Sequence, residues 1–127
     1  MMPALVERPE FQDEVKRLSR KYRHIENDLQ NFYKEFLSAP LVRAFAIPGF
    51  ERRLWKVRMK SSDQQRGKSG GFRLIFYFDE NKTTALHMLT LYPKTEREDI
   101  SPGELQRLLK DVMSKLQQEG KESKSPK

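Results

Sequence analysis

The feature that most constrains the fold is a strict alternation of apolar and basic residues over positions 55–60. The apolar positions are Trp55, Val57 and Met59, and the basic positions are Lys56, Arg58 and Lys60. Successive side chains of a β-strand point to opposite faces of a sheet, so a period of two predicts a half-buried strand. Such a strand buries three apolar side chains and places three cations side by side on its other face.

Two further strands are expected after this one. Residues 72–79 (FRLIFYFD) are apolar at nearly every position and rich in β-branched and aromatic types, which is typical of a central strand. Residues 83–92 (TTALHMLTLY) follow a short polar turn. The segment SSDQQRGKSGG at 61–71 reads as a flexible loop. Together these segments predict a meander of three antiparallel strands, with a further short strand over residues 4–6.

Helical patterns flank the meander on both sides. Apolar residues recur at spacings of three and four over residues 10–22 and 24–38, which predicts two helices joined by a short turn, ended by Pro40. Ser101, Pro102 and Glu104 form a helix-start signature before an apolar stripe that reaches Leu116. The expected fold is therefore α+β: a small antiparallel β-sheet, packed on one side by an N-terminal helical hairpin and a C-terminal helix.

Length and composition limit the possible classes. The chain of 127 residues fits one domain, which we expect over 1–118, with a disordered polar tail over 119–127. It contains no cysteine, which removes thiol nucleophiles and thiolate metal sites, and this is compatible with a cytoplasmic location. We expect neither a secretory signal nor a membrane span, because no apolar run is long enough.

The net charge of +7 is concentrated in one stretch. Between positions 51 and 73 there are eight cations and two acidic residues. Such a local field favours a polyanionic partner such as nucleic acid, although a solvated basic face is the alternative. Arg73 stands early in the second strand, where it can join the face that carries Lys56 and Arg58. Because an arginine can grip two phosphate oxygens at once, phosphate is the expected occupant.

Other motifs are weaker. The segment from Gly67 to Gly71 lacks the spacing of a phosphate-binding P-loop and leads into a strand, so an NTPase is rejected. What remains is a basic loop that includes Arg66 and Lys68. Tyr92 and Lys94 end the third strand, where Tyr92 is placed to stack on a base or to hydrogen-bond a phosphate. Neither the two histidines nor the acidic residues at 96, 98 and 99 have the spacing of a metal site. These acidic residues precede the last helix, and we expect their negative charge to interact favourably with the dipole of that helix.

Three segments together resemble a known family. They are LWKVRMK (54–60), RGKSGGFRLIFYF (66–78) and MLTLYPKTEREDIS (88–101). They are similar to the RelE/ParE superfamily of toxins, and within it to the HigB-type branch of bacterial type II toxin–antitoxin systems. The resemblance implies a RelE-like fold and a ribosome-dependent endoribonuclease, an mRNA interferase that needs neither metal nor cofactor. It also implies three partners, namely a cognate antitoxin, the ribosome and mRNA, and no association with membrane.

The resemblance also assigns roles by position. The catalytic set is Lys56, Arg58, Arg73, Tyr92 and Lys94, and additional RNA-binding cations are Arg53, Lys60, Arg66 and Lys68. Lys56 and Arg58 resemble the paired phosphate-binding residues of the sheet, and Arg73 resembles the arginine that steadies the scissile phosphate. Ser101 and Thr95 stand where RelE carries a tyrosine and an arginine, so the general base stays open, with Lys56 and Lys94 as candidates.

Two other functions remain open from the sequence. ParE relatives share the fold but inhibit DNA gyrase without cutting nucleic acid, so a noncatalytic gyrase inhibitor is one alternative. The second is a general RNA-binding module that uses the same basic face without cleavage. Convergence of Tyr92 and Lys94 on the cation cluster favours the nuclease, because docking alone does not need it.

Overall fold

The computed structural model describes residues 3–63 and 70–123. Its elements, in chain order, are β1 (Ala4–Glu7), α1 (Pro9–Leu18), α2 (Ile25–Phe36), α3 (Pro40–Arg43), β2 (Phe45–Ala46), β3 (Leu54–Met59), β4 (Phe72–Tyr77), β5 (Ala85–Pro93) and α4 (Pro102–Ser123). The α+β class is confirmed, as are the helical hairpin and the C-terminal helix. The short α3 and β2, which lie between Pro40 and Pro48, were not expected from the sequence.

The strands form one five-stranded sheet in the order β1-β5-β4-β3-β2. Strands β3, β4 and β5 are consecutive antiparallel neighbours, so the meander is confirmed. Strand β1 pairs parallel with β5, and β2 pairs antiparallel with β3 through two residue pairs. The meander at the centre is antiparallel as expected, but the parallel edge strand β1 makes the whole sheet mixed, which corrects the expectation of a purely antiparallel sheet.

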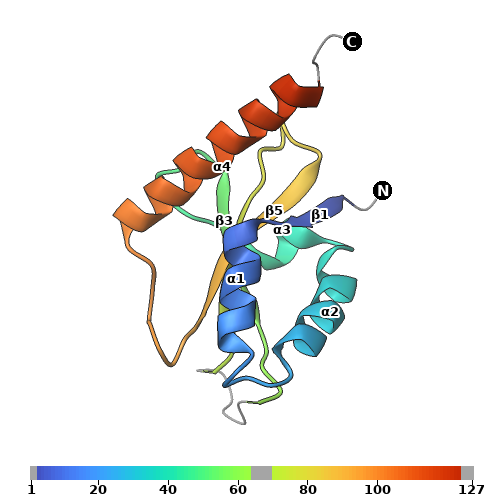
Figure 1. The fold of residues 1–127 in the computed structure, drawn as a ribbon, viewed down its shortest axis with the longest axis vertical. Helices are drawn as coiled ribbons and strands as arrows, with labels where there is room; N and C mark the ends of the chain where they lie inside the picture. The colour runs from blue at the N-terminus through green and yellow to red at the C-terminus, as the bar shows by residue number, and fades with distance from the viewer. Residues whose placement is uncertain (1–2, 64–69, 124–127) are drawn as a thin grey trace.

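Helices cover both faces of the sheet, which corrects the expectation that they share one side. The hairpin of α1 and α2 packs on one face, where Trp55, Leu74 and Phe76 belong to its apolar cluster. Helix α4 packs on the other face, against Ile75 and Tyr77. Figure 1 shows α4 running across one end of the molecule, just beyond the start of α1, where Arg107 pairs with Glu10 at 3.0 Å. The sheet lies between two layers of helices because β4 is apolar on both faces, and each apolar face must be covered to exclude water.

A bulge in β5 decides which of its side chains face α4. Ile75 pairs with Thr90, whereas the next residue of β4 pairs with Met88, so Leu89 is an extra residue in β5. Leu91 consequently faces the hairpin cluster, and Tyr92 faces the α4 cluster. Strict alternation counted from residue 87 would have placed these two side chains the other way round.

Helix α4 begins as the sequence predicts and ends later. The Ser101 Oγ accepts a hydrogen bond from the Glu104 backbone N–H at 3.2 Å, which is the expected cap. The helix then continues to Ser123, so the expectation of disorder from residue 119 is wrong for residues 119–123. Glu119 forms a bidentate ion pair with Arg8, at 2.8 Å for the shorter contact, which holds this turn against the start of the chain. Residues 124–127 lie outside the described residues.

Gly71 precedes β4 and provides a test of this packing. Its φ is +88°, and a Cβ there would lie 2.5 Å from the Met59 carbonyl oxygen. Gly71→Ala is therefore expected to lower the free energy of unfolding by about 2 kcal/mol or more, measured by chemical denaturation. Gly103→Ala is the matched control, because a Cβ at Gly103 meets nothing within 4 Å and the position is helical. Equal stability of the two variants would contradict the close approach at Gly71.

Candidate functional site

The sheet brings part of the predicted site into one row. Arg58 of β3 pairs in register with Arg73 of β4, and Arg73 pairs with Tyr92 of β5. Lys56 stands two residues before Arg58 and therefore shares its face. We call Lys56, Arg58 and Arg73 the basic strip. It lies on the sheet face that carries α4, at the margin of the α4 cluster, where Arg58 remains exposed.

The two arginines of the basic strip create a local excess of positive charge. Partial burial lowers the pKa of Arg73, and the neighbouring charge of Arg58 lowers it further. The Arg73 guanidinium nevertheless stays charged at neutral pH, since the ordinary pKa of arginine is far above 7. Like charges directly opposite on neighbouring strands destabilise a sheet. An anion that binds across Arg58 and Arg73 relieves this repulsion, which makes the pair suited to a phosphate group.

Tyr92 is a hydrogen-bond donor beside the basic strip and does not offer a face for stacking. Its side chain is 3% exposed, and its hydroxyl donates to Asp99 Oδ1 at 3.3 Å. Burial, the Asp99 charge and this hydrogen bond raise the pKa of Tyr92 to about 12. The guanidinium of Arg97 lies 5.4 Å from the centre of its ring. The expectation that Tyr92 stacks on a base does not fit this burial.

Asp99 is a site residue that the sequence interpretation missed. Its carboxylate accepts hydrogen bonds from the Ile100 backbone N–H at 2.9 Å and from Lys56 Nζ at 3.4 Å, in addition to the Tyr92 hydroxyl. The Ile100 hydrogen bond and the charge of Lys56 lower the pKa of Asp99, against a smaller opposing effect of burial. The carboxylate thus links the basic strip to Tyr92. The sequence predicts that it favours the dipole of the last helix; in the structure it contacts Lys56 and Tyr92, and the cap of α4 is Ser101.

Arg97 also lies at this site and was not predicted. Its Nε donates to the Asp99 carbonyl at 3.2 Å, and its guanidinium pairs with Glu104 of α4, which raises its pKa. Arg97 therefore links the segment after β5 to the start of α4 and covers Tyr92. The sequence shows only a cation two residues before Asp99, within a run of mixed charges. Such a run has no periodicity from which the direction of a side chain could be predicted.

The other predicted cations are not part of the basic strip as defined above. Arg53 precedes β3 and contacts Glu51 at 2.8 Å and Met113 of α4, so it stands beyond the opposite end of β3 from Arg58. Lys60 follows β3 and lines a groove described below. The Lys94 backbone N–H donates to the Gly71 carbonyl at 3.1 Å, which places Lys94 at the same end of the sheet as Arg73. Arg66 and Lys68 lie outside the described residues.

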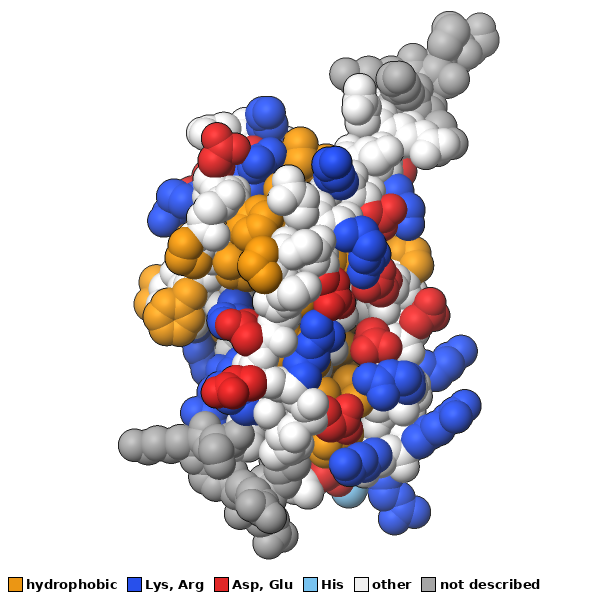
Figure 2. Space-filling view, turned by 90° about the vertical axis from the view of Figure 1, so that its left-hand side faces the viewer, with side chains coloured by type: hydrophobic (Ala, Val, Ile, Leu, Met, Phe, Trp, Pro, Cys, Tyr) orange, Lys and Arg blue, Asp and Glu red, His pale blue; other side chains and the backbone are white. Residues whose placement is uncertain are grey.

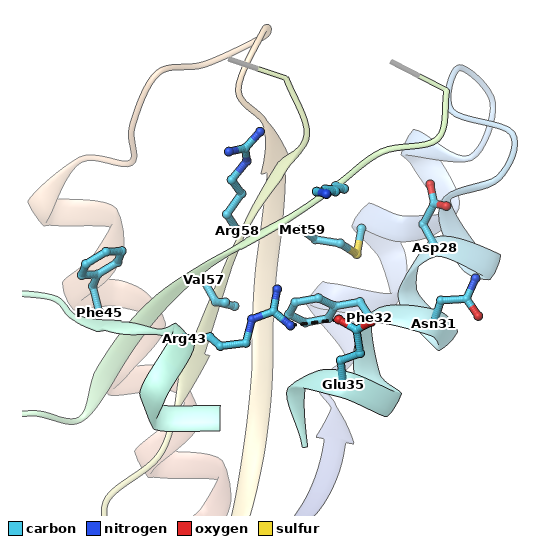
Figure 3. A pocket seen from close by; sticks show the side chains of 10 residues that line it. Asp28, Asn31, Phe32, Glu35, Arg43, Phe45, Val57, Arg58 and Met59 are labelled. Atoms are coloured by element: carbon cyan, nitrogen blue, oxygen red, sulfur yellow. Dashed lines mark hydrogen bonds and ion pairs between the residues drawn. The ribbon is translucent and has the colours of Figure 1, made fainter. Parts of the chain in front are cut away.

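A groove of about 450 Å³ runs between α2 and the edge of β3, and Figure 3 shows it from close by. Phe32, Phe45, Val57 and Met59 are the apolar residues of its lining. Its charged lining residues are Asp28 and Glu35 from α2, Arg43 from α3, and Arg58 and Lys60. Glu35 and Arg43 pair at 3.3 Å. Its mixed charge makes this groove a weaker phosphate site than the basic strip.

The histidines lie apart from the basic strip. The Nδ1 of His24, in the turn between α1 and α2, is 2.7 Å from Asp63 Oδ1, and this contact lowers the pKa of Asp63. His87 of β5 is buried, and its Nδ1 has no hydrogen-bond partner among the described residues. Burial and the charge of Arg8 lower the pKa of His87.

Charge on the surface is mixed. Figure 2 shows the side that carries the 94–101 segment and the start of α4, where basic and acidic side chains interleave and hydrophobic side chains gather near one edge. Within residues 3–63 and 70–123, no group of three metal-ligating residues comes together. None of the helices in this part of the chain is long and apolar enough to span a membrane.

Comparison with known proteins identifies the fold class. The α+β arrangement of a mixed sheet between a helical hairpin and a C-terminal helix is RelE-like. A solved structure of the E. coli toxin RelE, a mutant in the free state, matches with a TM-score of 0.51 and 20% sequence identity. The match covers 77% of this chain and 90% of that one. No protein-family model matches the sequence, and no curated protein matches it.

The position of Asp99 predicts how it acts on anion binding. Asp99→Asn removes a negative charge beside Lys56 but keeps an oxygen that accepts from Ile100 and Tyr92. We expect the variant to bind tripolyphosphate several-fold more tightly at low ionic strength, measured by calorimetry, because a repulsive charge is lost. Asp111→Asn is the control for net charge, since Asp111 pairs with Lys115 on α4. If both variants gain equally, the effect does not belong to the basic strip.

Proposed function

We propose that this protein is the toxin of a type II toxin–antitoxin system and that it cuts mRNA on the ribosome. The observation that carries the proposal is the row of Arg58, Arg73 and Tyr92 across three strands, with Lys56 beside it. The RelE-like fold supports the same conclusion. The quoted sequence segments favour the HigB-type branch.

The basic strip suits cleavage of RNA by its own 2′-hydroxyl group. That reaction requires the 2′-oxygen, the phosphorus and the leaving oxygen to lie in line, and it requires stabilisation of a phosphorane with added negative charge. Arg58 and Arg73 supply two fixed cations for the phosphate oxygens. Lys56 adds a third charge, held by Asp99 at 3.4 Å. None of these steps needs a metal ion.

The site offers weaker groups for proton transfer than for phosphate binding. With its pKa raised to about 12, Tyr92 keeps its proton at neutral pH and acts as a donor, not as a base. Lys56 and Lys94 remain the proposed candidates for proton transfer, and Asp99 is the carboxylate nearest to the strip. A site with two strong phosphate cations and weak acid–base groups fits a reaction whose alignment is completed by the ribosome. Action on ribosomes would take place in the cytoplasm.

The cognate antitoxin is the second proposed partner. An acidic or helical antitoxin segment that covers the basic strip would block access of mRNA to Arg58 and Arg73. Such a complex should weaken as salt increases, because its contacts are largely electrostatic. The alternative is an antitoxin that packs beside the helices of the hairpin.

Arg73 provides the direct test of the proposed nuclease. Arg73→Ala should lower mRNA cleavage in a translation reaction by about 100-fold or more and abolish growth arrest, since a cation on the scissile phosphate is lost. Cleavage is read by primer extension. Arg107→Ala is the matched control, because Arg107 lies on the surface of α4, pairs with Glu10 of α1 and carries the same charge. A folded Arg73→Ala variant that cleaves like the wild type would contradict the site.

Dependence on the ribosome gives a separate test. Purified protein should cut free mRNA far more slowly than mRNA in a translating extract, because the described strip holds phosphate but lacks a strong base. Efficient cleavage of free RNA at low enzyme concentration would overturn this dependence. Intact mRNA together with blocked DNA supercoiling would instead indicate a gyrase inhibitor, and RNA binding without either effect would indicate a binding module.

A further inference from the structure

Phe45 is an aromatic side chain left uncovered next to the basic strip. Its side chain is 74% exposed, and in the described part of the chain the other large hydrophobic residues with high exposure are the aliphatic Val6 and Val42. It belongs to β2, the two-residue strand at the edge of the sheet. Exposure of a single apolar residue is ordinary in itself, so its position decides whether it has a role.

The register places Phe45 on the face of the basic strip. Phe45 pairs with Lys56, and Ala46 pairs with Trp55. Ala46 packs against the hairpin cluster with Trp55, and Phe45 must therefore face the opposite side, as Lys56 does. Ile47, two residues further on, packs in the α4 cluster, which agrees with this assignment. In Figure 3, Met59 points toward α2, whereas the Phe45 ring lies across β3 from α2, although Phe45 and Arg58 both contribute to the lining of the groove.

Strand pairing sets the separations between Phe45 and the cations of the basic strip, and these separations are short enough for one RNA strand to contact both. Directly opposed residues of an antiparallel pair have Cβ atoms about 5 Å apart, and diagonal ones about 7–8 Å apart. Lys56 is therefore adjacent to Phe45, and Arg58 is its diagonal neighbour. An aromatic ring beside a row of cations on an open sheet is a typical arrangement for single-stranded RNA, where bases stack on the ring and phosphates contact the cations.

We propose that Phe45 is a positioning residue that stacks on a nucleobase of the RNA whose phosphate lies on the basic strip. The inference rests on the proposed function and adds a base-binding subsite to it. Stacking is tolerant of base identity, because every base offers a π-face. Phe45 thus holds the strand in place without imposing a sequence. The buried Tyr92 leaves this role open on the same face.

The test uses two uncleavable probes of equal charge: a short 2′-O-methyl RNA and an abasic oligomer of the same length. At low ionic strength the wild type should bind the base-bearing probe more tightly than the abasic one. Phe45→Ala should lose about 5- to 100-fold in affinity for the base-bearing probe and leave abasic binding unchanged. Phe45→Tyr should restore binding. Val42→Ala is the control, because Val42 is 83% exposed on α3.

A spectroscopic readout separates stacking from a structural effect. Phe45→Trp adds an exposed indole, whereas the native Trp55 is 2% exposed. Its fluorescence should be quenched by the base-bearing probe and not by the abasic one. If Phe45→Ala binds both probes like the wild type, or if it loses only antitoxin binding, the inference is overturned and the proposed nuclease stands. If the wild type neither binds these probes nor cuts mRNA, the proposed function and the inference both fail.

Discussion

The structure depends on the burial of β4 on both of its faces. Leu74 and Phe76 require the helical hairpin, and Ile75 and Tyr77 require α4, so the sheet is covered by helices on two sides. Arg73 is the single charged residue of this strand. It can be accommodated because it lies near the start of β4, at the margin of the α4 cluster. The same packing that excludes water from the strand therefore places one cation between Arg58 and Tyr92.

Some cations of this protein are paired with acidic residues, whereas those of the basic strip lie close to one another. Half of the six cations of the stretch 51–73 that the structure describes lie outside the basic strip. Two of them are paired with acidic residues: Arg52 pairs with Glu80, and Arg53 pairs with Glu51. The site is therefore a small region of excess charge on a surface where both signs are mixed. Asp99 moderates that excess at Lys56 and links it to the buried phenol of Tyr92. Such a local arrangement favours one phosphate over a long polyanion track.

The sequence predicted those parts that follow from periodicity. Alternation around Val57 was enough to put Lys56 and Arg58 on one face, and the continuous apolar run gave a central β4. The positions of Asp99 and Arg97 could not be predicted, because they lie in a segment without periodicity whose course depends on the start of α4. Helices were expected on one side, although a strand with two apolar faces needs two covers. Phe45 was missed because a two-residue strand has no pattern to detect.

Because Leu89 is an extra residue in β5, the orientation of the side chains after it depends on the number of residues in the strand. Exchanging one amino acid for another changes the contacts of that side chain and leaves the other side chains of the strand on their faces. Removing one residue would instead rotate every later position of the strand by half a turn, and would send a phenol into the hairpin layer and a leucine out among the arginines. Within this fold, an insertion or deletion in β5 is thus a more drastic event than any point substitution beyond it.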